Sequence, residues 1–274
     1  MRESGASKHF SCASAHCLCM MRRVDANARL GALIELLQRE GQVEVAPLAD
    51  TFGTAEMTVR RDLERLVAMG AARRVHGGAI SLLRRGEELP FAMRAIERTD
   101  AKRRIGAAVA AALHDGEAVV LDSGTTAVEV ARALVGRRLT VMPMSLHATA
   151  ELSSAESLRL VSPGGELRPG ELAMVGPLAL ASIGALHFDA AVLSCCGFSD
   201  GRVTPHDLGD AAVKQAMLGA AARVILATDA SKFERTAMAM VCEAASVEMV
   251  VTDTAAPRDA IAALHAAGVE VRCV

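Results

Sequence analysis

Residues 54–78 read TAEMTVRRDLERLVAMGAARRVHGG, and this stretch decides how the first part of the chain folds. Thr54 is a small polar residue of the kind that caps a helix N-terminus. The apolar residues that follow recur at i, i+4 and i+7 and so share one face of a predicted helix: Val59, Leu63 and Leu66. The other faces carry hydroxyl and guanidinium groups: Thr58, Arg60, Arg61 and Arg65. The pattern predicts a helix that packs by one face and exposes cations on another.

Two more helices are predicted before this one, and a hairpin after it. Residues 28–40 repeat apolar side chains at helical spacing, and residues 45–52 form a short helix that Gly53 ends with a tight turn. Downstream, basic side chains precede a Gly-Gly pair: Arg73, Arg74 and His76. Helix, short helix, turn, helix and hairpin in this order describe a winged helix-turn-helix, whose outer faces reach phosphates and base edges of DNA.

Positive charge is concentrated in this module. Residues 58–85 contain seven Arg and only two acidic residues, whereas the whole chain of 274 residues has a net charge of −2. A local cationic field suits a nucleic-acid-reading element, and the overall balance argues against indiscriminate binding by the whole surface. Arginines on a helix also occur as a merely solvated face, but the neighbouring helices favour the DNA-binding interpretation.

The rest of the chain alternates strands and helices. Residues 81–100 have no sustained period and are interpreted as a linker, after which apolar strands are predicted at 118–121, 139–142, 158–161, 190–194, 224–227, 248–251 and 269–273. Helices are predicted at 101–114, 126–135, 146–153, 172–186, 207–221 and 257–267. This alternation predicts a mostly parallel sheet covered on both faces, which binds ligands at the carboxyl ends of its strands.

Small and polar residues follow several of these strands. The first strand leads into a turn rich in Ser, Gly and Thr at a helix N-terminus, which can hold a phosphate or can be an ordinary capped turn. A Gly-Gly pair, a further Gly and a Lys follow later strands, and another Lys lies early in a helix. The predicted ligand-binding residues are Asp122, Ser123, Gly124, Thr125, Thr126, Gly164, Gly165, Gly197, Lys214 and Lys232.

Four strings of the sequence resemble the DeoR (DeoR/GlpR) family of bacterial transcriptional regulators. They are TVRRDL at 58–63, HGGA at 76–79, LDSGTT at 121–126 and DASKF at 229–233. The resemblance covers residues 24–274. It implies a winged helix-turn-helix at 24–80 and, after the 81–100 linker, an effector domain at 101–274 that is similar in fold to sugar-phosphate isomerases and senses a phosphorylated sugar or a related metabolite.

The resemblance also assigns roles and shows two departures. The DNA-binding residues are predicted to be Thr54, Thr58, Arg60, Arg61, Arg65, Arg73, Arg74 and His76. The family commonly has Thr-Asn where Pro143 and Met144 stand here, and an acidic residue where Ala212 stands. Asp207 and Asp210 are both candidates to replace that acid.

The cysteines indicate a reducing compartment. There are seven, an odd number, which does not suit a disulfide framework. Residues 1–23 are interpreted as an extension outside the fold. Its Cys and His residues could bind zinc but lack paired Cys-x-x-Cys spacing, so no metal site is predicted: His9, Cys12, His16, Cys17 and Cys19. Cys195 and Cys196 are interpreted as packing residues, with a redox sensor as the alternative.

These observations predict a cytoplasmic transcriptional regulator, most simply a repressor of carbohydrate-metabolism genes. It would bind double-stranded operator DNA as a homo-oligomer, respond to a phosphorylated sugar, and need no cofactor or membrane. No apolar run approaches the roughly 20 residues that span a bilayer. The alternative is a sugar-phosphate isomerase with a DNA-binding head. The sequence disfavours that enzyme because no second acid-base group stands at informative spacing from the candidate aspartates.

Overall fold

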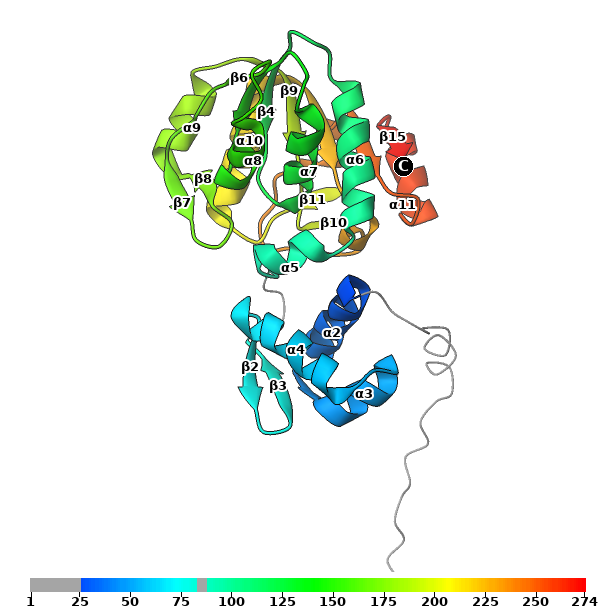
Figure 1. Cartoon of the computed structure of the whole chain (residues 1–274). Helices are drawn as coiled ribbons and strands as arrows, with labels where there is room; N and C mark the ends of the chain where they lie inside the picture. Colours follow the sequence, from blue (N-terminus) through cyan, green and yellow to red (C-terminus); the bar gives the residue numbers. More distant parts are fainter. Residues whose placement is uncertain (1–25, 83–87) are drawn as a thin grey trace, which may run out of the picture. The chain divides into compact units, whose positions relative to one another are not determined.

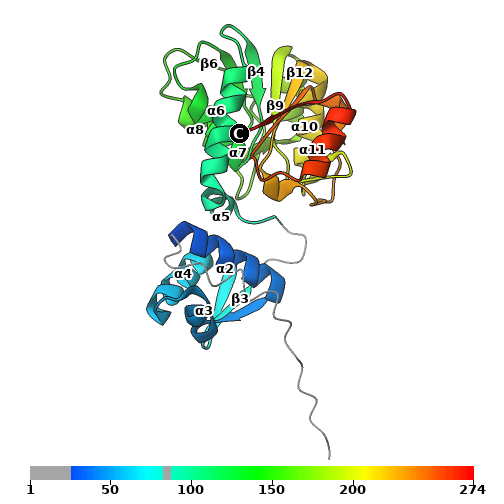
Figure 2. The same ribbon diagram turned by 90° about the vertical axis from the view of Figure 1, so that its right-hand side faces the viewer.

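The computed structural model describes residues 26–82 and 88–274, and the chain divides into two compact units, residues 1–85 and 86–274 (Figures 1 and 2). The Cys- and His-rich residues of the predicted extension at 1–23 lie outside the described residues.

The first unit is a winged helix-turn-helix, as the sequence predicted. Its helices are α2 (Ala26–Glu40), α3 (Val45–Phe52) and α4 (Glu56–Ala68). Its strands are β1 (Gln42–Glu44), β2 (Ala72–Val75) and β3 (Gly78–Ser81), which pair antiparallel in the order β1-β3-β2. The apolar faces predicted from helical spacing all point inward, and the buried residues are Leu30, Leu33, Ile34, Leu37, Leu48, Phe52, Val59, Leu63 and Leu66.

Thr54 does not cap α4, so the sequence expectation at this residue was wrong. The N-cap is Ala55, in an extended conformation, and the helix begins at Glu56. Gly53 ends α3 in the left-handed region, and the backbone N–H of Thr54 donates to the carbonyl of Ala49 at 3.0 Å. The turn between the helices therefore takes up Thr54, and the third helix starts later than the polar residue suggested.

The second unit is built on a seven-stranded sheet in which every neighbouring pair of strands is parallel, in the order β15-β14-β12-β9-β4-β5-β6. All seven strands coincide with apolar runs predicted as strands. They are β4 (Ala118–Leu121), β5 (Thr140–Pro143), β6 (Arg159–Leu160), β9 (Phe188–Leu193), β12 (Ala221–Ala227), β14 (Met249–Thr252) and β15 (Glu270–Cys273).

Helices cover both faces of this sheet, as Figures 1 and 2 show. On one face, α6 (Thr99–Ala112), α7 (Thr125–Leu134) and α8 (Leu146–Leu152) pack on a core that includes Val119 and Val192. On the other, α9 (Gly176–Gly184), α10 (Leu208–Ala220) and α11 (Arg258–Ala266) pack on a core that includes Val120 and Leu193. Successive strand residues thus enter opposite cores, which explains why each strand reads as a continuous apolar run.

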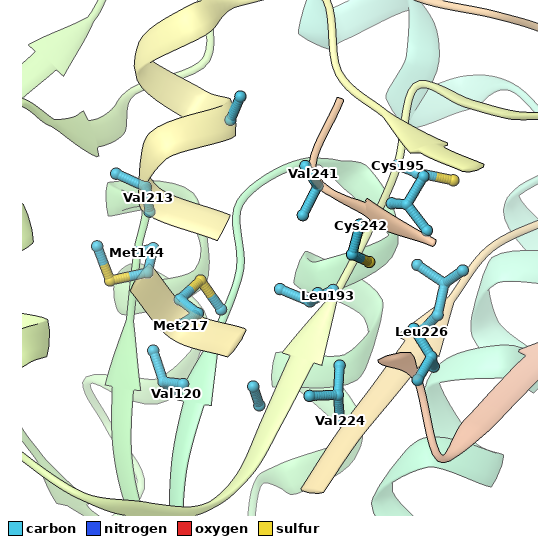
Figure 3. Close-up of a cluster of buried hydrophobic side chains, with 14 of the residues drawn as sticks. Val120, Met144, Leu193, Cys195, Val213, Met217, Val224, Leu226, Val241 and Cys242 are labelled. Carbon is cyan, nitrogen blue, oxygen red and sulfur yellow. The ribbon is translucent and has the colours of Figure 1, made fainter. Parts of the chain in front are cut away.

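The second core is drawn in Figure 3. Val120 and Leu193 come from the central strands and Met217 from α10, and Met144 directly follows β5. Cys195 and Cys242 are part of the same cluster and are buried.

Several short elements were not predicted. Two small antiparallel sheets contain β7 (Glu166–Arg168) with β8 (Ala173–Val175), and β10 (Gly197–Ser199) and β11 (Arg202–Thr204) with β13 (Cys242–Glu243). The helix expected from residue 172 begins at Gly176 because Ala173–Val175 pairs with β7. The remaining short elements are the 3-10 helices η1 (Ala230–Lys232) and η2 (Ala244–Ser246).

A further helix, α5 (Phe91–Ile96), lies within the stretch that was interpreted as a linker. Residues 88–100 belong to the second compact unit. Within the described parts of the chain, no helix combines the length and the apolar character needed to cross a membrane.

Candidate DNA interface and effector site

The outward face of α4 presents the cations that the sequence predicted there. Arg60, Arg61 and Arg65 are exposed, and Thr58 is half-buried. The Arg60 guanidinium donates to Glu56 at 3.0 Å on the helix surface. An exposed pair of this kind contributes only about 0.3–0.5 kcal/mol, so Arg60 can exchange Glu56 for a phosphate at little cost.

The hairpin after α4 adds a second set of exposed cations. Arg73 and Arg74 are exposed on β2, and His76 is exposed at the turn into β3. The helix and the hairpin belong to one unit. Leu66 on α4 and Ala71, which directly precedes β2, are both buried in it. The module therefore carries two cationic elements of the kind that contact DNA backbone in winged helix-turn-helix proteins.

Two features of this interface escaped the sequence reasoning. Met57, in the first turn of α4, is 61% exposed, and recognition helices read base edges from their N-terminal residues. Asp62 is buried and accepts a hydrogen bond from Arg29 Nε at 2.6 Å, which ties α4 to α2. This pair positions the recognition helix within its unit.

The order of the strands places the candidate ligand site. The chain leaves β4 toward β5 and β6 on one side, whereas β9, on the other side of β4, leads toward β12 and β14. Connections that diverge in this way open a crevice beyond the carboxyl ends of the two central strands. The residues that follow β4 and β9 are Asp122 and Ser194, so the predicted turn at 122–126 lies at this switch point.

Asp122 is the centre of a buried cluster. Its Oδ2 atom accepts hydrogen bonds from the backbone N–H of Ser194 at 2.7 Å, from the Ser194 hydroxyl at 2.9 Å and from the ammonium of Lys214. Lys214 Nζ also lies 3.3 Å from Asp210 Oδ1, one helical turn earlier on α10. Asp210 is thus the α10 carboxylate that contacts Lys214, whereas Asp207 caps α10 by accepting a hydrogen bond from the N–H of Asp210.

The charges in this cluster set its protonation. Burial alone would lower the pKa of Lys214, but the carboxylates of Asp122 and Asp210 hold it above its ordinary value. Burial raises the pKa of Asp210 to about 6. Lys214 is therefore an ammonium that is already engaged by two carboxylates, and its clearest role is to fix Asp122.

One oxygen of Asp122 is not engaged by the residues around it. Its Oδ1 atom is buried and has no hydrogen-bond partner among the described residues. A buried carboxylate oxygen that lacks a donor loses its hydration without compensation, so such an atom is a strong candidate to accept a hydrogen bond from a bound molecule. A ligand hydroxyl is a group of the right kind.

The turn that follows Asp122 offers donors for an anion. Ser123, Thr125 and Thr126 are buried, and Gly124 is the N-cap of α7 with φ 91°, a conformation that suits glycine. The first backbone N–H groups of a helix have no partner within the helix and favour an anion.

The other predicted residues are more scattered. Lys232 is half-buried on η1; burial alone would raise the pKa of Asp229, but the Lys232 ammonium helps to hold it below its ordinary value. Gly165 and Gly197 have packing reasons: a Cβ on Gly165 would lie 2.7 Å from the Val175 carbonyl, and one on Gly197 would overlap the backbone of Arg235. Gly164 is exposed.

The position of Pro143 and Met144 is apolar in the structure as well. Pro143 ends β5, and Met144 is only 1% exposed and belongs to the core of Figure 3. Met144 therefore contributes packing to the core.

The segment before α6 contributes charged residues that sequence reasoning missed. Arg94, on α5, pairs with Glu88 at 3.2 Å and with Glu171, and Arg168 pairs with Glu88 at 3.3 Å. The Phe91 ring stacks on His147 with centroids 3.8 Å apart. These contacts leave no periodic signal in the sequence, and most of them join residues that are more than 50 positions apart.

A winged helix-turn-helix with exposed cations, joined to a parallel α/β unit whose buried Asp122 cluster lies at the switch point of the sheet, defines a DNA-binding transcriptional regulator. The family model for the DeoR C-terminal sensor domain matches residues 97–254, and that for the DeoR-like helix-turn-helix domain matches residues 29–85. The chain belongs to the DeoR family.

Curated relatives agree with this membership. The transcriptional repressor AccR of Agrobacterium fabrum is 33% identical over 82% of this chain and 89% of that protein. The glycerol-3-phosphate regulon repressor of Escherichia coli is 32% identical over 84% and 91%. Among solved structures, ribose 5-phosphate isomerase A of Methanocaldococcus jannaschii aligns with 50% of this chain and 55% of its own, at 16% identity and a TM-score of 0.38, a likeness too slight to bear on function.

Proposed function

We propose that this regulator represses transcription by binding double-stranded operator DNA as a homo-oligomer, and that a phosphorylated sugar or related metabolite controls its operator affinity. The observation that carries the effector class is the buried Oδ1 of Asp122, an unpaired acceptor next to the turn at the N-terminus of α7. A ligand with both a phosphate and a hydroxyl matches these two groups. The regulated genes would be those of carbohydrate metabolism, and the site of action the cytoplasm.

The DNA contacts divide by element. Residues of α4 would enter the major groove and meet its flanking phosphates: Thr58, Arg60, Arg61 and Arg65. Residues of the hairpin would contact backbone or minor groove: Arg73, Arg74 and His76. Thr54, in the turn before α4, would meet a phosphate. One short helix makes few base contacts, so two or more copies are needed for specificity.

In the effector site, the phosphate would bind at the turn formed by Ser123, Gly124, Thr125 and Thr126, with Lys232 as a cation. Asp122 would accept a hydroxyl, and Lys214 would hold Asp122 in place. Gly164, Gly165 and Gly197 would shape the surrounding loops. The ligand must bind one arrangement of the protein more tightly than another, because equal affinity for both would leave operator binding unchanged.

Catalysis of sugar-phosphate isomerisation is the other candidate, and family membership does not favour it. The Oδ2 atom of Asp122 already accepts three hydrogen bonds, one of them from the Lys214 ammonium. Donors already occupy this oxygen, so it is not available to abstract a proton from a substrate.

The experiment is an electrophoretic mobility shift of the full chain on DNA upstream of its own gene and neighbouring genes. A panel of glycerol, aldose and ketose phosphates is added, with the unphosphorylated compounds as controls. The proposal predicts a specific shift that one phosphorylated compound changes and its unphosphorylated form does not. A specific shift that is indifferent to the whole panel would reject the effector class, and no specific shift on any fragment would reject the repressor.

A further inference from the structure

Arg94 brings a cation to the turn where the effector phosphate is proposed to bind. It lies on α5 and is only 8% exposed. Its Nη1 atom lies 3.8 Å from the point where a side chain at residue 124 would begin, and the Ser194 hydroxyl lies 3.4 Å from the same point. Because residue 124 is glycine, nothing of its own fills the space between the guanidinium and the turn.

The hydrogen bonds of the guanidinium leave this inner edge open. Nε donates to the carbonyl of Leu89 at 2.9 Å. Nη2 faces the carboxylates, 3.2 Å from Glu88 and in contact with Glu171. Nη1, the nitrogen nearest Gly124, has no hydrogen-bond partner among the residues that the structure describes. A guanidinium N–H that has no acceptor in the protein can donate to an anion or another polar ligand at the turn.

The carboxylates that hold Arg94 are shared with a second arginine. Arg168 lies 3.3 Å from Glu88 and 4.0 Å from Glu171, so two cations and two anions form one largely buried network. Burial alone would lower the pKa of Arg94, but Glu88 and Glu171 raise it, and the guanidinium stays charged. Buried ion pairs recover little net stability after desolvation, so stability alone is a weak reason for such a network beside a ligand turn.

We propose that Arg94 is an anion-binding residue of the effector site, and that the phosphate of the effector competes with Glu88 and Glu171 for its guanidinium. This inference rests on the proposed function of the crevice. A phosphate presents several oxygens to a guanidinium and forms charge-assisted pairs with it, as a carboxylate does. Occupation of the turn would therefore weaken the hold of Arg94 on its two carboxylates.

Such an exchange would change the segment through which the two units are joined. Glu88 is the first described residue of the second unit. Lys102 anchors α5 by donating to the carbonyls of Arg94 and Glu97, the latter at 2.8 Å. A ligand that takes Arg94 from Glu88 would thus act directly on the joining segment, which supplies the differential interaction that coupling requires.

The first test measures the melting temperature of the full chain against inorganic phosphate, with chloride added to keep ionic strength constant. Phosphate is expected to raise the melting temperature of the wild type. Arg94→Met is expected to weaken the apparent phosphate affinity by about tenfold or more. The matched control is Arg223→Met, which removes another largely buried arginine that pairs with Glu117 at 2.7 Å, and it should keep the wild-type affinity.

The second test separates competition from simple positioning and does not depend on how well Arg94→Met folds. Glu171→Gln removes one competing charge, so it should tighten phosphate binding, whereas a residue that only positions Arg94 would weaken it when changed. Unchanged or weaker binding by Glu171→Gln would overturn the competition, and wild-type affinity in Arg94→Met would overturn the anion-binding role. Failure of the wild type to bind phosphate would overturn both the competition and the anion-binding role. Operator binding is tested separately by the mobility shift, so its outcome does not depend on this result.

Discussion

Lys214 on α10 and Asp122 after β4 form a buried ion pair in which each side chain is at most 2% exposed. The pair joins a helix on one face of the sheet to the turn at the switch point, and Asp210 completes it at 3.3 Å. Lys232, by contrast, is half-buried on η1. The two lysines predicted from the sequence to bind effector therefore have different surroundings and should behave differently when changed.

Replacement of Lys214 should lower the free energy of unfolding. Lys214→Met leaves the carboxylates of Asp122 and Asp210 buried together, and loss of one partner of such a pair costs about 3–5 kcal/mol. Urea unfolding of the full chain measures the change in free energy of unfolding.

Lys232→Met should lower the free energy of unfolding by less than about 1 kcal/mol. It should abolish the effector response while operator binding stays near normal. A retained response would remove Lys232 from the site.

The exposed arginines of α4 should control salt dependence. Arg60→Ala with Arg61→Ala should weaken operator binding and flatten the slope of log affinity against log salt, by about 0.9 for each phosphate that the protein no longer neutralises. Arg39→Ala is the control, because Arg39 is also exposed in the same unit but lies on α2. Fluorescence anisotropy at several salt concentrations provides the slopes, and equal slopes for the two variants would argue against phosphate contacts by α4.

The lowered pKa of buried Lys102 predicts that the free energy of unfolding depends on pH. Burial lowers its pKa to about 8, whereas an unfolded lysine titrates near about 10.4. Between these values the unfolded chain binds more protons than the folded chain, so the contribution of Lys102 to stability rises with pH and is constant below the window. The stability of wild type relative to Lys102→Met should therefore increase from about pH 8 to about pH 10.

The neighbour Arg103 provides the control for this measurement. It is 64% exposed on α6. Arginine side chains in general do not lose their proton in proteins, so the difference between wild type and Arg103→Met should not depend on pH in this window. Denaturant unfolding at each pH is the measurement. A flat profile for Lys102→Met as well would show that the Lys102 pKa is not lowered.

The buried cysteines should be unreactive. Burial raises the pKa of the Cys195 and Cys242 thiols to about 11, so almost no thiolate is present near neutral pH. Peptide mass spectrometry after iodoacetamide treatment should find Cys273, which is exposed, labelled well before either of them. Rapid labelling of Cys195 would revive the redox-sensor alternative that the sequence left open.

Most of the fold could be predicted from helical periodicity and from continuous apolar runs in the sequence. The strands of the large sheet could be located because both faces are buried, so residues such as Val119, Val120 and Leu121 are all apolar. The turn at 122–126 could be found because a strand and a helix bracket it. Strands of three residues, such as Glu166–Arg168, are too short for any periodic signal.

The charged network at α5 could not be found in the same way. Residues 88–98 have no apolar period, and Arg94 is held in place by Glu171, which lies far along the chain. Tertiary ion pairs order this segment, and a single sequence does not reveal which distant carboxylate an arginine will meet. The same limit hid the Arg29–Asp62 pair, although both residues stand within stretches that were recognised.

Coupling between operator binding and a phosphorylated ligand at the Asp122 turn is the proposal on which the others depend. The most direct measurement is the operator affinity of the wild type and of Asp122→Asn, by fluorescence anisotropy, with and without the phosphorylated compound that changes the mobility shift. We expect the compound to change the wild-type affinity and to leave Asp122→Asn unaffected, while both proteins bind operator. An equal response of the two proteins would contradict the proposed coupling.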